Sequence, residues 1–247
     1  MLMPRAFLIA LQFLTTLPVR LSEQPTAHTC GRSLLYYPLV GLIIGLLLCV
    51  IGWLLHGSSP YIVAAIMLSV WVLITGGLHL DGLADSADAW IGGLGDRQRT
   101  LDIMKDPYCG PIAVVTLILV LLLKFTALTQ LASNQHWIAL LLAPVLGRTI
   151  LLVLFLTTPY VRAEGLGHLL SLHMPRGQTQ YVVLATLVAI FLFWGLQALW
   201  LMVAIGLGFV VLRGLMMRRL GGATGDTAGA LTEITETIAL LISALIG

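Results

Sequence analysis

Charged residues are scarce in this sequence. Asp, Glu, Lys and Arg make up 10% of its 247 residues, while 59% are hydrophobic. Soluble domains carry about 25% charged residues, and the mean hydropathy here is +1.00, so an ordinary soluble domain is excluded. The formal net charge of +2 is too small for the basic surface that binds nucleic acid. No nucleic-acid partner is expected.

Cysteines and several short motifs are also lacking. Cys30, Cys49 and Cys109 are odd in number and form no CxxC, which argues against a disulfide framework or a zinc site and for free thiols. The first apolar stretch carries only Arg5 and precedes no small-residue cleavage site, so no conventional signal peptide is expected. The glycines at 221–225 are not followed by Lys-Ser/Thr, which excludes a Walker A loop.

The sequence has long apolar segments instead. A membrane-spanning helix needs roughly 20 mostly apolar residues. The clear candidates are residues 34–55, 61–78, 111–131, 137–157 and 228–246. Residues 181–212 are too many for one straight span, and Gly195 can turn a hairpin between two short ones. Residues 1–18 are too few, so we expect 1–33 to form an N-terminal interfacial segment.

Loop charges predict the orientation, because basic residues mark cytoplasmic loops. If 181–212 is two spans, every basic loop falls on one side, whereas a single span would put residues 213–219 outside. We therefore predict an all-α polytopic membrane bundle with about seven transmembrane helices and a cytoplasmic N-terminus. Residues 1–247 would form one catalytic domain in the bacterial cytoplasmic (inner) membrane.

Acidic residues gather on the same predicted side. A channel or carrier needs polar groups along a route through the bilayer, whereas acids at one face are typical of an enzyme acting on cytosolic substrates. We expect residues 79–110 to form a cytoplasmic acidic catalytic loop. The acids in or beside these loops are Asp81, Asp85, Asp88, Asp96, Asp102, Asp106, Glu164 and Asp226.

Three aspartates directly after the second apolar segment are the strongest chemical signal. In a helix, Asp81, Asp85 and Asp88 would share one face, because they are spaced i, i+4 and i+7. Oxygen ligands of this kind suit Mg²⁺, so these residues are predicted to be metal ligands and catalytic groups. An acidic helix start stabilised by the helix dipole is the alternative. Gly82 would let a phosphate come close, and His79 is a ligand, a base or a structural histidine.

Two further motifs add candidate substrate-binding residues. Lys105 beside Asp106 supplies a cation for phosphate, although a capped amphipathic surface helix explains this segment equally well. Arg162 and Glu164 precede two glycines, where they can bind substrate or cap a helix.

A glycine-rich stretch precedes the last apolar segment. Gly222 and Thr224 lie in a loop whose backbone N–H groups can face a phosphate. Asp226 and Glu233 follow at i, i+7 on one helix face, and they are candidates for a second metal site or for a base.

Two features lie inside the apolar segments. Lys124 and Arg148 are the only basic residues there, and one of them is expected to meet a carboxylate or a substrate phosphate. Gly41 and Gly45 form a GxxxG pattern, which predicts either a close helix contact or the dimer face of a homo-oligomer.

These motifs, in order along nearly the whole chain, resemble those of the cobalamin synthase family, the adenosylcobinamide-GDP ribazoletransferases. Members of that family often carry Arg where this chain has Lys105. The lysine keeps the positive charge but lacks the two-pronged hydrogen-bonding guanidinium of arginine. The matching residues are Gly76, Gly77, His79, Asp81, Gly82, Leu83, Ala84, Asp85 and Asp88, then Ile103, Met104, Lys105, Asp106 and Gly110, then Arg162, Glu164, Gly165, Leu166 and Gly167, and last Gly221, Gly222, Thr224, Gly225 and Asp226.

The resemblance implies a reaction with Mg²⁺ as cofactor. A hydroxyl of α-ribazole, or of its 5′-phosphate, attacks the cobinamide-side phosphorus of adenosylcobinamide-GDP. GMP leaves, and adenosylcobalamin or its phosphate forms. The residue chemistry agrees, because Mg²⁺ held by Asp81, Asp85 and Asp88 would screen a diphosphate, and a carboxylate such as Asp85 or Asp88 can take the hydroxyl proton.

Two other functions compete with this one. Gly77, Asp81 and Asp85 match the latter half of the CDP-alcohol phosphotransferase signature, but the preceding half is missing, so we treat the match as an analogy of chemistry. A cation- or proton-coupled transporter would use acids within the membrane, and Glu233 and Glu236 are its best support. The clustering of the other acids at one face argues against it.

Overall fold

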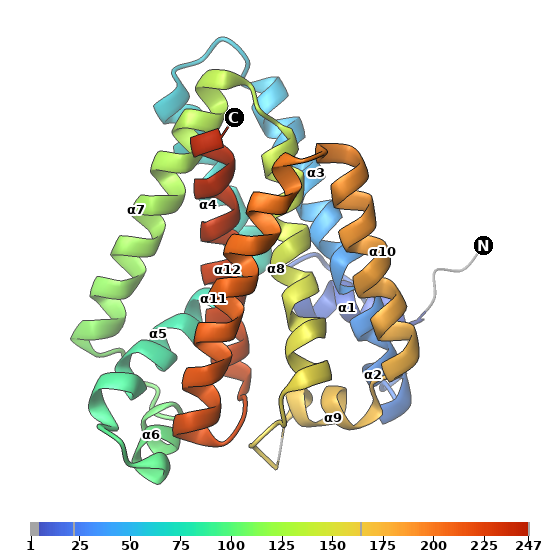
Figure 1. Cartoon of the computed structure of the whole chain (residues 1–247), viewed down its shortest axis with the longest axis vertical. Helices are drawn as coiled ribbons and strands as arrows, with labels where there is room; N and C mark the ends of the chain where they lie inside the picture. Colours follow the sequence, from blue (N-terminus) through green and yellow to red (C-terminus); the bar gives the residue numbers. More distant parts are fainter. Residues whose placement is uncertain (1–4, 22, 164, 247) are drawn as a thin grey trace.

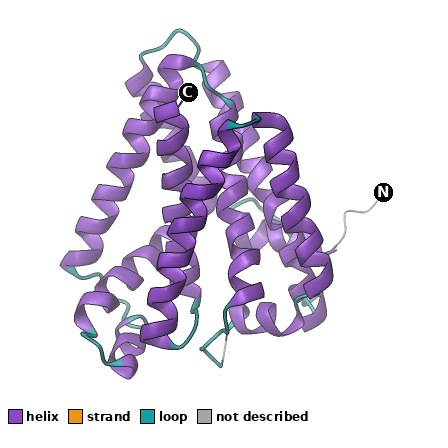
Figure 2. Ribbon diagram, in the orientation of Figure 1, coloured by secondary structure: helices purple, strands orange, loops and turns teal. Residues whose placement is uncertain are grey.

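A computed structural model describes residues 5–21, 23–163 and 165–246, and these form a bundle of helices (Figures 1 and 2). The described part contains no strand, only an isolated bridge between Tyr160 and Ala223. Six helices are long and apolar enough to cross a membrane, or seven if the bent pair α4 and α5 is one span. The prediction of an all-α, multi-pass membrane bundle with about seven spans is confirmed.

Prolines mark the start of several spanning helices. Proline lies in the first turn of α3, α4 and α7, where its missing N–H costs no helical hydrogen bond. In chain order the helices are α1 (Arg5–Leu14), α2 (Ala27–Ser33), the 3₁₀ turn η1 (Leu34–Tyr36), α3 (Tyr37–Leu54), α4 (Pro60–Thr75), α5 (Leu78–Gly92), α6 (Arg97–Ile103), α7 (Pro111–Asn134), α8 (Ile138–Thr157), α9 (Leu166–His173), α10 (Arg176–Trp194), α11 (Gln197–Leu220) and α12 (Gly225–Ile246).

The segment 181–212 forms two helices, as predicted, but both are longer than expected. Helix α10 begins at Arg176 and α11 ends at Leu220, so the cluster at 213–219 lies in the last turns of α11 and not in a loop. Gly195 joins them with φ of 63°, a conformation that favours glycine.

The two ends of the bundle differ in character (Figure 1). Short connections join α3 to α4, α7 to α8 and α10 to α11 at one end, while α5, α6 and α9 lie at the other. The basic and acidic segments therefore share one end, as the loop charges predict. The predicted loop at 79–110 is largely helical, because it contains α5 and α6.

Helix α5 turns sharply away from the preceding span. Its axis makes an angle of 87° with that of α4, and Gly76 and Gly77 form the bend with φ of 61° and 67°. With α4 along the membrane normal, α5 lies across the end of the bundle and not within a span.

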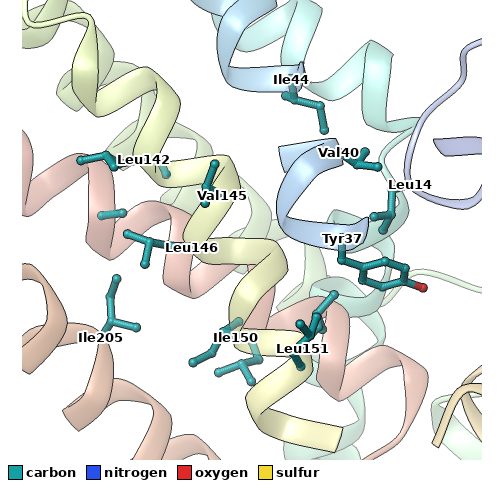
Figure 3. Close-up of a cluster of buried hydrophobic side chains, with 14 of the residues drawn as sticks. Leu14, Tyr37, Val40, Ile44, Leu142, Val145, Leu146, Ile150, Leu151 and Ile205 are labelled. Carbon is teal, nitrogen blue, oxygen red and sulfur yellow. The ribbon is translucent and has the colours of Figure 1, made fainter. Parts of the chain in front are cut away.

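Helices α3 and α8 pack closely enough to exclude any larger residue at the GxxxG positions. A Cβ at Gly45 would lie 2.7 Å from the carbonyl oxygen of Leu140, and one at Gly41 would clash with the Pro144 carbonyl. The close helix contact is confirmed, but it lies within the chain, so these glycines are not available as a dimer face. Apolar side chains from both helices fill the space around this contact (Figure 3).

Helix α12 packs along α5, α7, α8 and α11 and carries two buried acids. Lys124 of α7 pairs with Glu233 at 2.5 Å and with Glu236 at 2.7 Å, and Arg148 of α8 also pairs with Glu236. The Lys124 ammonium lies 4.7 Å from the centroid of the Trp71 ring. We call Lys124, Arg148, Glu233 and Glu236 the buried charge quartet, and both basic residues meet carboxylates as predicted.

Candidate active site

The three predicted aspartates lie on one helix at the polar end of the bundle. Asp81, Asp85 and Asp88 belong to α5, so the i, i+4 and i+7 spacing places them along one side of a helix. Leu and Ala, which favour helices, fill much of this segment. Within the described part of the chain, the side chains of Asp81 and Asp85 make no ion pair or hydrogen bond, so both remain available to a ligand.

Asp88 is different, because its carboxylate is already engaged. It accepts hydrogen bonds from the backbone N–H groups of Gly110 (2.5 Å) and Ala113 (2.9 Å). These belong to the first turn of α7, where N–H groups lack helical partners. A Cβ at Gly110 would lie 2.7 Å from this carboxylate. In this structure Asp88 joins α5 to α7, and its role in metal binding or catalysis stays a prediction.

Two glycines bring the fourth aspartate close to α5. A Cβ at Gly82 would lie 2.8 Å from the carbonyl oxygen of Asp226, and one at Gly229 would lie 3.3 Å from Cα of His79. The backbones of α5 and α12 therefore approach closely at these positions. Gly82, a predicted substrate-binding residue, has a packing role in this structure, and through it Asp226 reaches the α5 aspartates.

Carboxylates dominate the electrostatics around Asp81, Asp85 and Asp226. Burial, followed by the charges of Asp81 and Asp226, raises the pKa of Asp85 to about 6, although Arg162 opposes the shift. The Arg162 guanidinium lies 2.6 Å from the Asp226 carboxylate. Burial also raises the pKa of the neighbouring Tyr160 hydroxyl. One cation thus faces several acids, and a divalent cation would relieve their repulsion.

Two cavities meet at this cluster. The first, which we call the open groove, has a volume of about 640 Å³ and is lined by Asp81, Asp85, the Gly76-Gly77 bend and Tyr108. The second, which we call the small cavity, has a volume of about 160 Å³ and is lined by Asp81 and Asp226 among largely apolar residues. Asp81 lines both.

The predicted metal-ligand set is not assembled as one cage. In the residues that the structure describes, no three His, Cys, Asp or Glu side chains form a group that could hold a metal ion. Mg²⁺ commonly uses only one or two carboxylates, with water and phosphate oxygens as the remaining ligands. Asp81 and Asp85, one turn apart in the open groove, meet that requirement.

Glu233 does not belong to this site. It lies seven residues beyond Asp226 on α12, a distance of about 10 Å along the helix axis, and its carboxylate pairs with Lys124. The ion pair with Lys124 argues against Glu233 as a metal ligand, which stays a prediction. The helical spacing correctly predicts a shared face, but the neutralising lysine comes from a different helix.

Gly222 and Thr224, two other predicted substrate-binding residues, support the fold. A Cβ at Gly222 would clash with the Pro159 carbonyl. The Thr224 hydroxyl accepts from the Thr227 N–H (3.2 Å), and the Thr227 hydroxyl accepts from the Thr224 N–H (2.9 Å). Thr224 is fully buried and caps α12 reciprocally, and it lines neither the open groove nor the small cavity.

The remaining predicted residues lie around the groove or outside the described part. Lys105 and Asp106 are exposed after α6, and Asp106 accepts from the Tyr108 N–H at 3.0 Å. Arg162 reaches the site through its ion pair with Asp226. Glu164 lies outside the residues that the structure describes.

Sequence reasoning missed Tyr37, which lines the small cavity at the start of a span. Only a polar aromatic residue in an apolar segment marks it in the sequence. His79, which was singled out, also lines this cavity and is 5% exposed.

Comparison with known proteins agrees with the motifs. Residues 6–244 match the family described as cobalamin-5-phosphate synthase. A Pseudomonas fluorescens (strain Pf-5) protein named adenosylcobinamide-GDP ribazoletransferase is 59% identical over 239 residues, which cover 97% of this chain and 98% of the relative. A protein of the same name from Stutzerimonas stutzeri is 55% identical over 238 residues, covering 96% and 97%. No solved structure matches the chain. The predicted resemblance is confirmed, and the chain belongs to the cobalamin-5-phosphate synthase family.

Proposed function

We propose that this protein transfers the cobinamide-phosphate part of adenosylcobinamide-GDP to α-ribazole, or to its 5′-phosphate, and releases GMP. The product is adenosylcobalamin or its 5′-phosphate, which makes this the last assembly step of cobalamin biosynthesis. The names of the relatives, which state a ribazole transfer from adenosylcobinamide-GDP, support this activity. The family description, a synthase of cobalamin-5-phosphate, supports the product.

The observation that carries the proposal is the position of Asp81 on the shared wall of the two cavities. A transfer between two bound molecules needs the nucleophile and the phosphorus to meet at one point. The open groove, about 640 Å³, suits the larger activated donor, and the small cavity, about 160 Å³, suits part of the nucleoside acceptor. Phe13, Leu78 and Asp81 line both cavities, and Asp81, the acid among these three, marks that meeting point.

Asp81 and Asp85 would hold Mg²⁺ in the open groove. Both side chains offer hard oxygen ligands without a competing partner in the described chain. Burial, followed by the neighbouring carboxylates, raises the pKa of Asp85, and a bound cation would relieve the repulsion among these carboxylates. When bound, Mg²⁺ supplies the positive charge that neutralises the diphosphate and the departing GMP.

Asp226 is the residue that we assign as the base. It lines the small cavity next to Asp81, where the hydroxyl of the acceptor would lie. As the hydroxyl oxygen forms its bond to the cobinamide-side phosphorus, the bond from that phosphorus to the GMP oxygen breaks, and Asp226 accepts the hydroxyl proton. Arg162, 2.6 Å away, holds the carboxylate in place.

We place this end of the bundle in the cytoplasm, in a bacterial inner membrane. The basic residues cluster at this end, as the positive-inside rule requires of cytoplasmic segments, and a GDP-activated substrate is cytosolic. A reporter fused after Gly222, between α11 and α12, is expected to be cytoplasmic. Periplasmic activity of that reporter would contradict the orientation.

The reaction is tested with the purified full-length protein in detergent. With Mg²⁺, GDP-cobinamide and α-ribazole it is expected to release GMP, and Asp81→Asn or Asp85→Asn is expected to lower the rate at least about a hundredfold. Asp96→Asn is the control, because Asp96 only caps α6 through the Arg99 N–H, a bond that Asn can also accept.

Two outcomes would count against the proposal. Wild-type rates in both α5 variants would refute the metal assignment. No GMP release, with substrate uptake into proteoliposomes instead, would indicate a transporter. The structure weakens that alternative, because Glu233 and Glu236, which favour it in the sequence, are neutralised by Lys124 and Arg148.

A further inference from the structure

The small cavity is lined by apolar side chains and two acids. Phe13 of α1, Leu151 and Phe155 of α8 and Leu170 of α9 contribute apolar side chains. Asp81 and Asp226 contribute carboxylates to the same lining. Asp81 is exposed, so the cavity reaches solvent there. An engineered cavity of about 150 Å³ lined by Leu, Ile and Phe binds benzene, so the small cavity, at about 160 Å³, has room for one six-membered ring but not for a whole nucleoside.

Besides Asp226 Oδ2, which forms an ion pair with Arg162, two buried polar atoms of the lining residues have no hydrogen-bond partner in the described structure. They are Tyr37 Oη and His79 Nε2, and the two side chains are 1% and 5% exposed. The Ser33 hydroxyl lies near the phenol, but it donates to the Cys30 carbonyl at 2.6 Å. In the view of Figure 3, the Tyr37 oxygen points away from the labelled apolar side chains. Buried polar groups are almost always paired, so both atoms call for a ligand.

We propose that the small cavity binds the aromatic base of the nucleoside acceptor, an inference that rests on the proposed function and locates its second substrate. Ribazole is a ribose that carries a dimethylbenzimidazole, two fused rings with one free ring nitrogen and two methyl groups on the six-membered ring. Phe13, Leu151 and Phe155 contact the rings, and Tyr37 Oη donates a hydrogen bond to the free nitrogen. His79 Nε2 hydrogen-bonds the ribose.

This arrangement orients the sugar as well as the base. With the six-membered ring against Leu151 and Phe155, the ribose lies beside Asp81 and Asp226, where its hydroxyl meets the donor phosphorus. It also gives a basis for selectivity. A purine base would bury additional ring nitrogens against apolar walls without partners, which such a site rejects.

The test uses Tyr37→Phe in the full-length protein in detergent, with GMP release as the assay. Loss of one neutral hydrogen bond is expected to raise the KM for α-ribazole about three- to tenfold, while the KM for GDP-cobinamide stays unchanged. Tyr36→Phe is the matched control. Tyr36 packs edge-on against Phe7 with ring centroids 5.9 Å apart and does not line the cavity, so both KM values should equal those of the wild type.

A second variant tests the shape of the cavity. Leu151→Phe adds volume to the wall and is expected to lower kcat/KM for α-ribazole more than for the riboside of unsubstituted benzimidazole, which lacks the two methyl groups. Circular dichroism checks that each variant is folded. If Tyr37→Phe leaves the KM for α-ribazole unchanged, the cavity does not hold the base. The same conclusion follows if Leu151→Phe changes kcat/KM equally for both nucleosides.

Direct binding separates this inference from the proposed reaction. Equilibrium dialysis with α-ribazole alone is expected to show binding that Tyr37→Phe weakens and Tyr36→Phe does not. A wild-type protein that releases no GMP but binds α-ribazole through Tyr37 would overturn the reaction and keep the site. A wild-type protein that releases GMP with no dependence on Tyr37 would overturn the site and keep the reaction.

Discussion

Replacing Lys124 with methionine is expected to destabilise the protein by about 3 kcal/mol. Lys124 is 3% exposed and pairs with Glu233 and Glu236. Methionine keeps an unbranched apolar chain but removes the charge, so the buried charge quartet, two cations and two anions, is left with one net negative charge.

Two independent magnitudes set this expectation. Removing one partner of a buried ion pair costs about 3–5 kcal/mol. An aspartate at the centre of a spanning helix costs about 2.5–3.5 kcal/mol. The ranges overlap near 3 kcal/mol, and the lower part is appropriate here, because Arg148 still pairs with Glu236.

The assay is an SDS titration of the protein in mixed micelles, with helix content followed by circular dichroism. Adding Glu233→Gln to Lys124→Met restores neutrality and is expected to recover about 2 kcal/mol as a coupling energy. Lys105→Met is the matched control at an exposed lysine, where a change within about 0.5 kcal/mol is expected.

The reasoning fails if Lys124→Met costs no more than the Lys105→Met control. It also fails if the effects of Lys124→Met and Glu233→Gln simply add. Either result would mean that the quartet does not depend on charge balance for stability.

Three further predictions concern the site itself. Gly82→Ala would place a Cβ 2.8 Å from the Asp226 carbonyl and is expected to lower GMP release at least about tenfold by moving α12 from α5, whereas Gly206→Ala, with nothing within 4 Å of its Cβ, should leave the rate unchanged. Arg162→Gln removes the ion pair that holds Asp226 at 2.6 Å and is expected to lower kcat about ten- to a hundredfold, and a wild-type kcat would contradict that role. Chelation should abolish activity, and added Mg²⁺ should restore it. Because the pKa of Asp85 is raised to about 6 and only the ionised carboxylate binds the cation, the Mg²⁺ concentration for half-maximal rate should rise as pH falls through that value. A pH-independent Mg²⁺ requirement would count against Asp85 as a ligand.

The apolar pattern was sufficient to predict the number of spanning helices but not the residues at which they begin and end. Hydropathy and loop charges correctly predicted two helices in 181–212 that meet at Gly195. The loop charges were informative because only an even number of spans in this segment keeps every basic loop on one side of the membrane. They could not predict that α10 begins at Arg176 or that α11 reaches Leu220. At a membrane surface, helix ends are set by local hydrogen bonds, such as that from Arg97 to the Leu220 carbonyl (2.8 Å), and not by hydrophobic length.

The glycine patterns predicted close contacts but not the partners in those contacts. The pattern at Gly41 and Gly45 predicted a close contact, and a close contact is present, but its partner is α8 of the same chain. Gly82 was expected at the substrate, and it instead lets α12 approach. A glycine in a sequence indicates that something comes near the backbone, while the identity of that neighbour is a tertiary property.

The acids divide into three roles that their sequence context could not separate. Glu233 is neutralised by a lysine 109 residues away along the chain, and Asp88 is held by N–H groups that begin 22 residues away. Each carboxylate lies on a helix face with suitable spacing, so the local pattern is the same for all of them. What distinguishes Asp81 and Asp85 is that neither carboxylate has an ion pair or a hydrogen bond within the described chain. Asp81 is exposed in the first turn of α5, whereas Asp85 is half-buried, and burial followed by the charges of Asp81 and Asp226 raises its pKa. An unpartnered, half-buried carboxylate contributes nothing to stability, so the partner that Asp85 lacks is best sought in the metal and the phosphates of a substrate.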